Sequence, residues 1–394
     1  MQKKLLALSV AGALAAPAAA LAQVEVYGTI HMSFNKMKYG ESSTGLPSVS
    51  KFDVASHASN VGVRARESLG GGLSAWAQVE TNAAMERSNN LAHTSNFASR
   101  NSAVGMQGNF GNIFVGQWTT PWSDLDALWG IGTVATYGPI TSIIGRRETT
   151  GSAPNPNCAN SGSGVPGACD SVEAAGGVGH PFWKRISNSI HYQSPVFGGA
   201  QVKVAYQTNQ DKATAGATVT AADPSMWSAS VTWSGMGGRA RIGAAVDRHM
   251  DFTTVDETDS GWRVTGGYNF GFVDVGFAYE QMTYKAGGDW DATQWGLQAA
   301  VPIGQGAIRA GYSKAEKPDT PLGELDAGAT QYNIGYDYRF SKRTTVGAGY
   351  AHIKNEDLAQ FTWSGLSSAQ NGTSVTPPPG TDVSIFFVSM IHRF

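Results

Sequence analysis

Long apolar runs are missing from most of this sequence. After the first 22 residues, no stretch approaches the roughly 18 consecutive apolar residues that a membrane-spanning helix needs. Charge is also scarce: charged residues make up 15% of the chain, with 28 basic and 30 acidic side chains. The first shortage excludes a bundle of membrane helices. The near-balance of charge is not typical of a nucleic-acid-binding protein.

Residues 1–22 are typical of a secretory signal peptide. Residues 1–4 form a basic start, residues 5–14 form a short apolar stretch, and residues 20–22 fit the small-x-small cleavage rule. The segment is too short for a spanning helix. We expect cleavage after residue 22, export of the protein, and a single mature domain over residues 23–394.

Cysteine is almost absent, since Cys158 and Cys169 are the two in the chain. They follow an export signal and lie close together in sequence, so we expect them to form a disulfide in an oxidising compartment. No further ligands at suitable spacing accompany them, which argues against a zinc site. We expect no metal and no cofactor.

Glycine and aromatic residues are plentiful, with 49 Gly, 11 Trp, 13 Tyr and 16 Phe. These residue types suit strands and turns better than helices. From residue 24 onward, stretches of about ten residues alternate apolar and polar side chains, for example at 185–192, 201–207, 239–247, 272–280 and 331–340. Such a strand has one face suited to lipid and one suited to water.

Short and long connections alternate between these stretches. Short turns occur at 67–72, 109–112, 194–199, 234–238, 270–272, 302–306 and 340–343. Longer polar stretches occur at 37–57, 83–97, 119–183, 208–223, 250–259, 286–290, 317–326 and 355–381. Seven short and eight long connections make fifteen, which join sixteen strands. We therefore predict an all-β fold, a 16-stranded antiparallel transmembrane β-barrel, whose interior is wide enough for an aqueous channel.

The final stretch, 382–394, gives the clearest strand signal. Its residues alternate between two faces. One face carries Phe386, Val388, Met390, His392 and Phe394, and the other carries Ile385, Phe387, Ser389, Ile391 and Arg393. A long apolar strand at an open edge would invite aggregation. We predict that it closes the barrel against the strand at 24–30.

The longest connection, 119–183, is far longer than a hairpin needs. Its first part carries large apolar side chains that need a packing partner: Trp122, Leu125, Leu128 and Trp129. If this third long loop folds inward, these residues anchor it to the barrel wall and Asp124 and Asp126 lie at the constriction. The alternative is that both acids lie on an extracellular surface.

Basic residues dominate the polar face of the predicted strands. An Arg at the middle of the lipid face costs about 2–4 kcal/mol, so we place these residues in the lumen: Arg64, Arg66, Arg100, Arg185, Lys203, Arg239, Arg241, Arg263 and Arg309. The acids on that face are Asp247, Asp274, Glu280 and Asp337. A basic wall facing an acidic loop gives a transverse field that favours small polar solutes. The excess of basic wall residues predicts a weak anion preference.

Four segments resemble the general porins of Gram-negative bacteria, of the β-proteobacterial type: VEVYGTIHMSF, SNVGVRARESLGGGLSAWAQVE, FASRNSAVGMQGNFGNIFVGQW and RISNSIHYQSPVFGGAQVKVAY. The ending His392–Arg393–Phe394 is similar to the closing signature of that family. The resemblance runs the whole length after residue 22. It implies a homotrimer of sixteen-stranded barrels in the outer membrane, with the third loop folded inward and Phe394 read by the barrel-assembly machinery.

The resemblance also implies constriction positions at Asn60, Arg100 and Arg185. Asn60 departs from the usual Arg of the family, Gln117 stands where an Arg is frequent, and His191 stands where a basic residue is common. The filter should therefore be less basic than is typical of the family.

Three functions compete at this point. The first is a passive channel for small hydrophilic solutes and ions in a shell of outer-membrane lipid. The second is a substrate-selective channel, for a sugar or an organic anion, in which Trp118, Trp122 and Trp129 offer stacking surfaces. The third is a hydrolase that uses histidines such as His180 or His191, but no motif such as G-x-S-x-G supports it. We favour the first and expect no enzyme activity.

Overall fold

The computed structural model describes residues 23–83, 85, 97–129, 137–144, 182, 185–208, 224–251, 256–285, 289–321, 323–363 and 377–394. The predicted signal peptide and both cysteines lie outside these residues. The cleavage site and the disulfide therefore stay predictions.

Strands make up nearly all of the described elements. In chain order they are β1 (Gln23–Tyr39), β2 (Val49–Ser56), β3 (Asn60–Gly70), β4 (Leu73–Asn82), β5 (Ser102–Gly108), β6 (Gly111–Thr119), β7 (Arg185–Gln193), β8 (Ala200–Gln207), β9 (Ser225–Gly235), β10 (Ala240–Met250), β11 (Thr258–Asn269), β12 (Asp274–Tyr284), β13 (Trp290–Ile303), β14 (Gly306–Ala315), β15 (Asp319–Thr320), β16 (Gly323–Glu324), β17 (Ala329–Arg339), β18 (Thr344–Asn355) and β19 (Val383–Arg393). The short helical pieces are α2 (Pro121–Asp124), α3 (Asp126–Trp129), η3 (Pro139–Thr141) and η4 (Met236–Gly238). Within the described ranges, no helix is long and apolar enough to cross a membrane.

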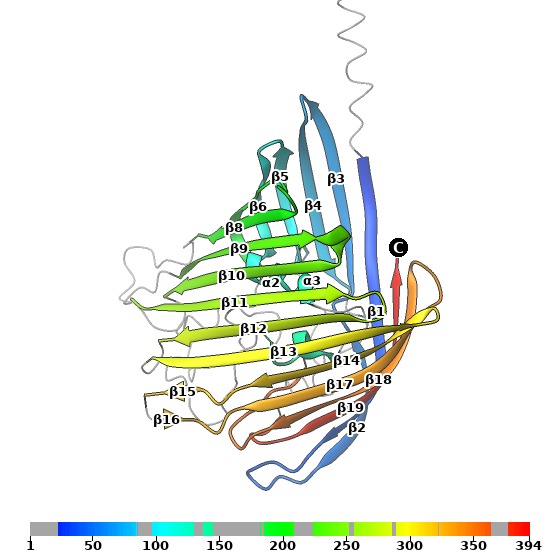
Figure 1. Ribbon diagram of the computed structural model, residues 1–394, viewed down its shortest axis with the longest axis vertical. Coiled ribbons are helices and arrows are strands. Elements are labelled where there is room, and N and C mark those ends of the chain that lie inside the picture. The colour runs from blue at the N-terminus through cyan, green and yellow to red at the C-terminus, as the bar shows by residue number, and fades with distance from the viewer. Residues whose placement is uncertain are drawn as a thin grey trace, which may run out of the picture.

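The strands close into one antiparallel barrel (Figure 1). β1 pairs with β2 over its second half and with β3 over its first half, so β2 and β3 make one wall strand, interrupted where Ala58 has a φ of 53°. β15 and β16 pair with each other as a small hairpin. Counting β2 and β3 once and leaving out that hairpin reduces the 19 strands to sixteen, which confirms the predicted barrel.

The last strand closes the barrel, as predicted, but in a different register. β19 pairs with β1 from Thr29↔Arg393 to Tyr39↔Val383, so its partner is mainly the second half of β1. The predicted partner, 24–30, instead pairs mostly with β3. Closing a barrel requires tilted strands, so neighbouring strands are shifted along each other and their ends do not align. Alternation along one strand carries no information on the size of this shift.

The two faces of β19 show the predicted alternation. Phe386 and Val388 are exposed by 60% and 54%, whereas Ile385 and Phe387 are exposed by 0% and 5%. Exposed apolar side chains repeat on the outward face of the other wall strands. This outer face is fit for lipid.

Strand β7 departs from the predicted alternation. The sequence pattern puts Ile186 on the same face as Ile190 and Tyr192, but Ile186 is buried and the other two are exposed. The pairing of β6 with β7 shifts register between Gly116 and Trp118, and Asn188 takes a φ of 50°. A bulge of this kind adds one residue and turns the face over.

The inner face is not polar everywhere. On β1, β18 and β19 it carries apolar side chains, and these form a buried cluster with residues of the segment 137–144 that packs on them: Met37, Ile353, Ile385, Phe387, Tyr137, Ile143 and Ile144. Alternation alone predicts a wet inner face. Here a loop segment covers it, so apolar residues are tolerated.

Candidate functional site

The helical turn after β6 starts on a clear sequence signal. Thr120 caps α2, accepting a hydrogen bond from the N–H of Ser123 at 3.3 Å, and Pro121 stands at the first helical position. The turn presents Trp122 and Leu125, which are fully buried with Phe182 and wall residues of β10 and β12.

Backbone groups of this segment bind inward-facing side chains of the wall. The N–H of Trp122 donates to Ser228 Oγ at 3.2 Å, and its carbonyl accepts from Arg263 Nη1 at 3.2 Å. Thr265 Oγ1 donates to the carbonyl of Leu125 at 3.2 Å. Both helical turns therefore lie against the inside of β9–β12, as Figure 1 also shows.

Glycines in the wall make room for this contact. A Cβ at Gly276 would lie 2.3 Å from the carbonyl oxygen of Trp129, and one at Gly243 would lie 2.6 Å from Leu128 Cδ1. Real Cβ contacts are not that short. The backbone of α3 therefore approaches the wall at a place where only glycine fits.

The segment 137–144 contacts another part of the inner wall. Tyr137 packs its ring on His57, with centroids 5.2 Å apart, and its hydroxyl lies 3.2 Å from Ser33 Oγ. Ser33 Oγ lies 2.6 Å from His57 Nε2. Gln331 Nε2 donates to the carbonyl of Tyr137 at 3.0 Å. Two described segments of the third long loop are thus attached inside the barrel.

Arg100, which lies just before β5, is at the centre of a polar group with residues of β1 and β4. Its guanidinium pairs with Glu80 and donates to Asn82 Oδ1 at 3.2 Å. Tyr27 donates its hydroxyl proton to Glu80 at 2.9 Å. The charge of Arg100 is therefore compensated by a wall acid.

A second polar chain runs from Asn101 to the loop. Arg185 Nε donates to Asn101 Oδ1 at 2.7 Å, and Asn101 Nδ2 donates to Thr119 Oγ1 at 3.4 Å. Thr119 Oγ1 donates to Asp124 Oδ1 at 3.3 Å, and Asp124 pairs with Lys203 at 2.7 Å. The two groups are neighbours, because Asn101 follows Arg100 directly, and together they are called the polar network below.

Most of the other inward charges also form ion pairs. Arg263, fully buried, pairs with Asp126 of the loop and with Glu280 at 3.4 Å. The remaining pairs lie within the wall, at Arg64–Glu25 (2.7 Å), Arg241–Asp274 (2.6 Å) and Arg309–Asp337 (2.5 Å). The basic excess expected in the lumen is therefore much reduced.

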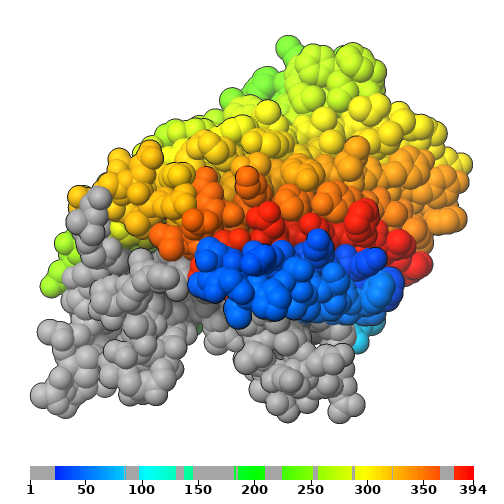
Figure 2. Space-filling model, turned by 90° about the horizontal axis from the view of Figure 1, so that it is seen from below, coloured from blue at the N-terminus to red at the C-terminus, as the bar shows by residue number. Residues whose placement is uncertain are grey.

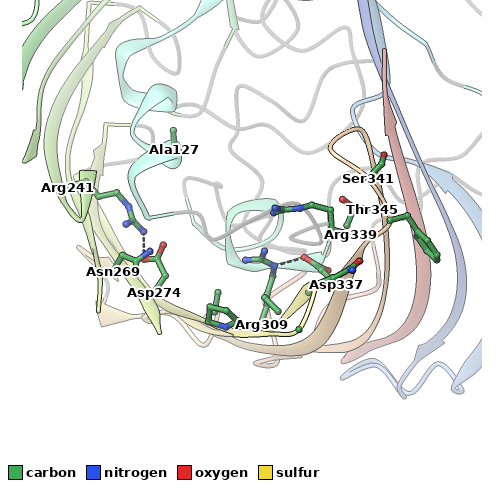
Figure 3. A pocket seen from close by; sticks show the side chains of 16 residues that line it. Ala127, Arg241, Asn269, Asp274, Arg309, Asp337, Arg339, Ser341 and Thr345 are labelled. Atoms are coloured by element: carbon green, nitrogen blue, oxygen red, sulfur yellow. Dashed lines mark hydrogen bonds and ion pairs between the residues drawn. The ribbon is translucent and has the colours of Figure 1, made fainter. Parts of the chain in front are cut away.

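Several inward-facing cations of the wall have no acid within ion-pair distance in the described part of the chain, among them Arg66, Arg185 and Arg339. Arg66 donates to Ser74 Oγ at 2.9 Å, and Arg185 donates to Asn101. Arg339 points into a cavity of about 830 Å³ that is lined by residues of the short turns (Figure 3). The Arg241–Asp274 and Arg309–Asp337 pairs line the same cavity. Arg339 therefore gives it a net positive charge.

The aromatic residues divide into two kinds. Trp122 and Trp129 are fully buried, so they offer no stacking surface. Trp76 and Trp118 are partly exposed on the inner face, and both pack on Phe114, with centroids 5.3 and 5.1 Å away. We call Trp76, Phe114 and Trp118, which lie on β4 and β6, the aromatic stripe. Among the described residues, no group of three or more His, Cys, Asp or Glu side chains could hold a metal ion.

A family model described as Gram-negative porin matches residues 7–358. The chain belongs to the Gram-negative porin family. It is 29% identical over 375 residues to outer membrane porin protein 32 of Delftia acidovorans, which covers 91% of both chains. It is 25% identical over 358 residues to major outer membrane protein P.IB of Neisseria meningitidis, covering 89% of this chain and 93% of that protein.

Solved structures share the fold. The anion-selective porin from Comamonas acidovorans aligns with a TM-score of 0.64 at 20% identity, covering 95% of this chain and all of that one. OmpT of Vibrio cholerae in its trimer form aligns with a TM-score of 0.61 at 16% identity, covering 95% and 99%. The predicted family and fold are confirmed, and the porin is a protein of the Gram-negative outer membrane.

The porin brings together some of the predicted lumen residues and separates others. Arg100, Arg185, Lys203 and Asp124 share the polar network, whereas Asp126 lies against buried Arg263. Arg64 lies at the edge of that network, over the ring of Tyr27 at 5.2 Å. The other three lie apart from it. Arg66 lies on β3, and Arg241 lines the short-turn cavity. Arg239 lies in the turn after β9, over the ring of Tyr268 at 5.8 Å.

Several residues of the site escaped the sequence analysis. Glu80, Asn101 and Thr119 complete the polar network, and Glu25 neutralises Arg64. The sequence does contain a signal for Glu80. Every second residue of β4 lies on the same face, and this face carries Trp76, Gln78, Glu80 and Asn82. No signal was present for Asn101, which lies one residue before β5 and acts through its loop position.

Proposed function

We propose that this porin is a passive, weakly anion-preferring diffusion channel for small hydrophilic solutes and ions. The observation that carries the proposal is the charge arrangement of the inner wall. Paired charges give alternating local fields, which favour polar solutes over apolar ones. The unpaired cations Arg66, Arg185 and Arg339 tip the balance toward anions.

The narrowest part of the channel, in this proposal, is bordered by Arg100, Asp124, Arg185 and Lys203. Their support is the polar network, in which the chain from Arg185 to Lys203 joins the wall to α2. Arg64, Arg66, Asp126, Arg239 and Arg241 act elsewhere, at the mouth or as anchors. The porin works as a homotrimer, in line with the trimeric neighbour, and the assembly machinery reads Phe394.

The channel acts without catalysis. Two Ser–His contacts exist inside it, Ser33–His57 at 2.6 Å and Ser189–His191 at 2.9 Å. Both imidazoles are buried against aromatic rings, of Tyr137 and Phe114. In the described residues, neither has a carboxylate to orient it, which a hydrolytic triad requires.

Swelling of liposomes that contain the purified porin tests the passive channel. Neutral sugars of increasing size should enter at rates that fall steadily with size and rise linearly with concentration. A rate that saturates with one sugar, while others of equal size are excluded, would overturn the passive reading.

The aromatic stripe favours a second candidate, a channel selective for solutes with a flat apolar face. Trp76 Nε1 donates to Asn112 Oδ1 at 2.8 Å, which fixes the indole, and Phe114 packs behind it. Aromatic carboxylates should then block ion current reversibly at millimolar concentration, and Trp118→Ala should remove the block. Equal currents with benzoate and acetate in the wild type would rule this candidate out.

A further inference from the structure

Asn101 lies where several strands of the inner wall meet. It stands just before β5, and its main-chain carbonyl accepts a hydrogen bond from Gln78 Nε2 of β4 at 2.9 Å. Its side chain contacts Thr119, the last residue of β6, and Arg185, the first residue of β7. One amide thus links the strand before the third long loop with the strand after it.

The amide of Asn101 has a fixed orientation. Its Oδ1 accepts two hydrogen bonds, from Arg185 Nε at 2.7 Å and from the backbone N–H of Thr119 at 3.2 Å. Both of these groups can only donate, so the oxygen and not the nitrogen of the amide faces them. The Nδ2 group donates to Thr119 Oγ1 at 3.4 Å. Arg185 is therefore held through the Nε of its guanidinium.

Arg185 keeps its positive charge because Asn101 is neutral. In the described part of the chain, no carboxylate lies within ion-pair distance of Arg185, and its two Nη groups make no hydrogen bond. Arg185 interacts electrostatically with Arg100 and Glu80, which form an ion pair with each other. Asp124 of the same network pairs with a lysine of β8. Each of these two acids is thus engaged by another cation.

The polar network faces the interior of a closed wall. Tyr27 of β1 donates its hydroxyl proton to Glu80, so the network extends to the strand at which the barrel closes. β19 pairs with β1 on one side and β18 on the other, and Figure 2 shows blue β1, red β19 and orange β18 side by side. A solute therefore meets the charge of Arg185 only by entering the channel.

We propose that Asn101 is a positioning residue that sets the ion preference of the channel through Arg185. It holds the guanidinium at the proposed constriction with a neutral acceptor, so the two Nη groups stay available to a passing chloride or small carboxylate. The change Asn101→Asp would keep the shape of the side chain and replace the neutral hydrogen bond by an ion pair. The inference rests on the proposed channel function and names the residue behind its ion preference.

Reversal potentials of the purified porin, recorded in planar bilayers in a KCl gradient, test the proposal. Asn101→Asp should lower the ratio of anion to cation permeability by up to about fivefold at low salt, because one unit charge beside the path is neutralised. The ratio should then match that of Arg185→Gln. Asn101→Ala should shift it part of the way, because Arg185 keeps its charge and loses its position.

A double variant shows whether Asn101 acts through Arg185. Asn101→Ala/Arg185→Gln should have the permeability ratio of Arg185→Gln alone, because the amide then has no guanidinium to position. A purely structural role, through the contacts with Thr119, predicts the same effect of Asn101→Ala with and without Arg185. The control Asn333→Ala removes an amide from the inner face of β17, outside the polar network, and should leave the ratio unchanged.

Two results would overturn the proposal. Asn101→Asp could have the wild-type permeability ratio, or the effect of Asn101→Ala could persist in the Arg185→Gln background. If Asn101→Asp does not fold, the comparison of Asn101→Ala in the two backgrounds decides alone. A wild-type channel that prefers cations would contradict the proposed function and not this inference, because each variant is compared with its own parent.

Discussion

Asp124 and Asp126 are two residues apart but have different partners. Asp124 faces Lys203, and both side chains are about one-fifth exposed. Asp126 faces Arg263, whose side chain has no exposure at all. The first acid is therefore placed to act on passing ions, and the second is placed to hold the loop.

Asp124→Asn should increase the preference for anions. The change leaves Lys203 without its partner and removes one negative charge next to the proposed path. A unit charge 4 Å away is worth about 1 kcal/mol in water, so the ratio of anion to cation permeability should rise by up to about fivefold at low salt, and less at high salt. The reversal potential in a KCl gradient measures this ratio. A shift toward cations would contradict the assignment.

Asp126→Asn should loosen the loop rather than change selectivity. Arg263 would keep Glu280 at 3.4 Å but lose its charged loop partner. A hydrogen bond to a charged group is worth about 1.5–3 kcal/mol, and that free energy holds α3 to the wall. We expect noisier single-channel currents and an unchanged reversal potential. Quiet currents would show that Asp126 is not an anchor.

At the residue scale, the sequence predicted which side chains face inward better than it predicted their partners. Alternation is local, so Lys203, Arg241 and Arg309 could be placed from their neighbours. Partners are not local: Arg263 binds an acid 137 residues away, and Arg64 binds one 39 residues away. For this reason the sequence analysis missed Glu25 and Glu80 as partners of Arg64 and Arg100.

At the scale of elements, strands were easy to predict and their irregularities were not. A period of two is visible in ten residues, and it gave the number and faces of most wall strands. The break between β2 and β3 and the bulge of β7 depend on single residues with positive φ, Ala58 and Asn188. Alanine does not signal that conformation, and asparagine, although enriched in it, occurs at too many other positions of the chain to mark this one.

The site where α3 contacts the wall could not be predicted from the sequence either, because glycine is common throughout the chain. Gly276 matters because the carbonyl of Trp129 lies where its Cβ would be. Gly276→Val should push α3 away from the wall and into the lumen, and so lower single-channel conductance.

The matched control for this change is Ala307→Val, which adds bulk on the same inner face but on β14 and not on β10–β12, the strands that α3 contacts most. Heat-induced unfolding, followed by gel mobility, should occur at nearly the same temperature in both variants. Equal conductance of Gly276→Val and the wild type would show that α3 does not limit the path.

At the scale of the whole molecule, closure depends on the last residue as well as on β19. Gly28 and Phe394 exchange two backbone hydrogen bonds of 3.1 Å, and the ring of Phe394 covers Gly28. Deleting Phe394 removes both bonds, each worth about 1 kcal/mol, at the seam where the first and last strands meet.

We therefore expect deletion of Phe394 to lower the heat-unfolding temperature of the purified barrel. Phe340→Ala removes an exposed aromatic residue of a short turn and should have little effect. If the deletion refolds and unfolds as the wild type does, the seam is held by the β1–β19 ladder alone.

The central claim is an open, weakly anion-preferring channel, and planar-bilayer recording of the purified porin in a KCl gradient tests it most directly. The account predicts large ohmic conductance steps, grouped in threes, with a reversal potential displaced modestly toward the anion side. Absence of steps, or a strongly cation-selective potential, would contradict it.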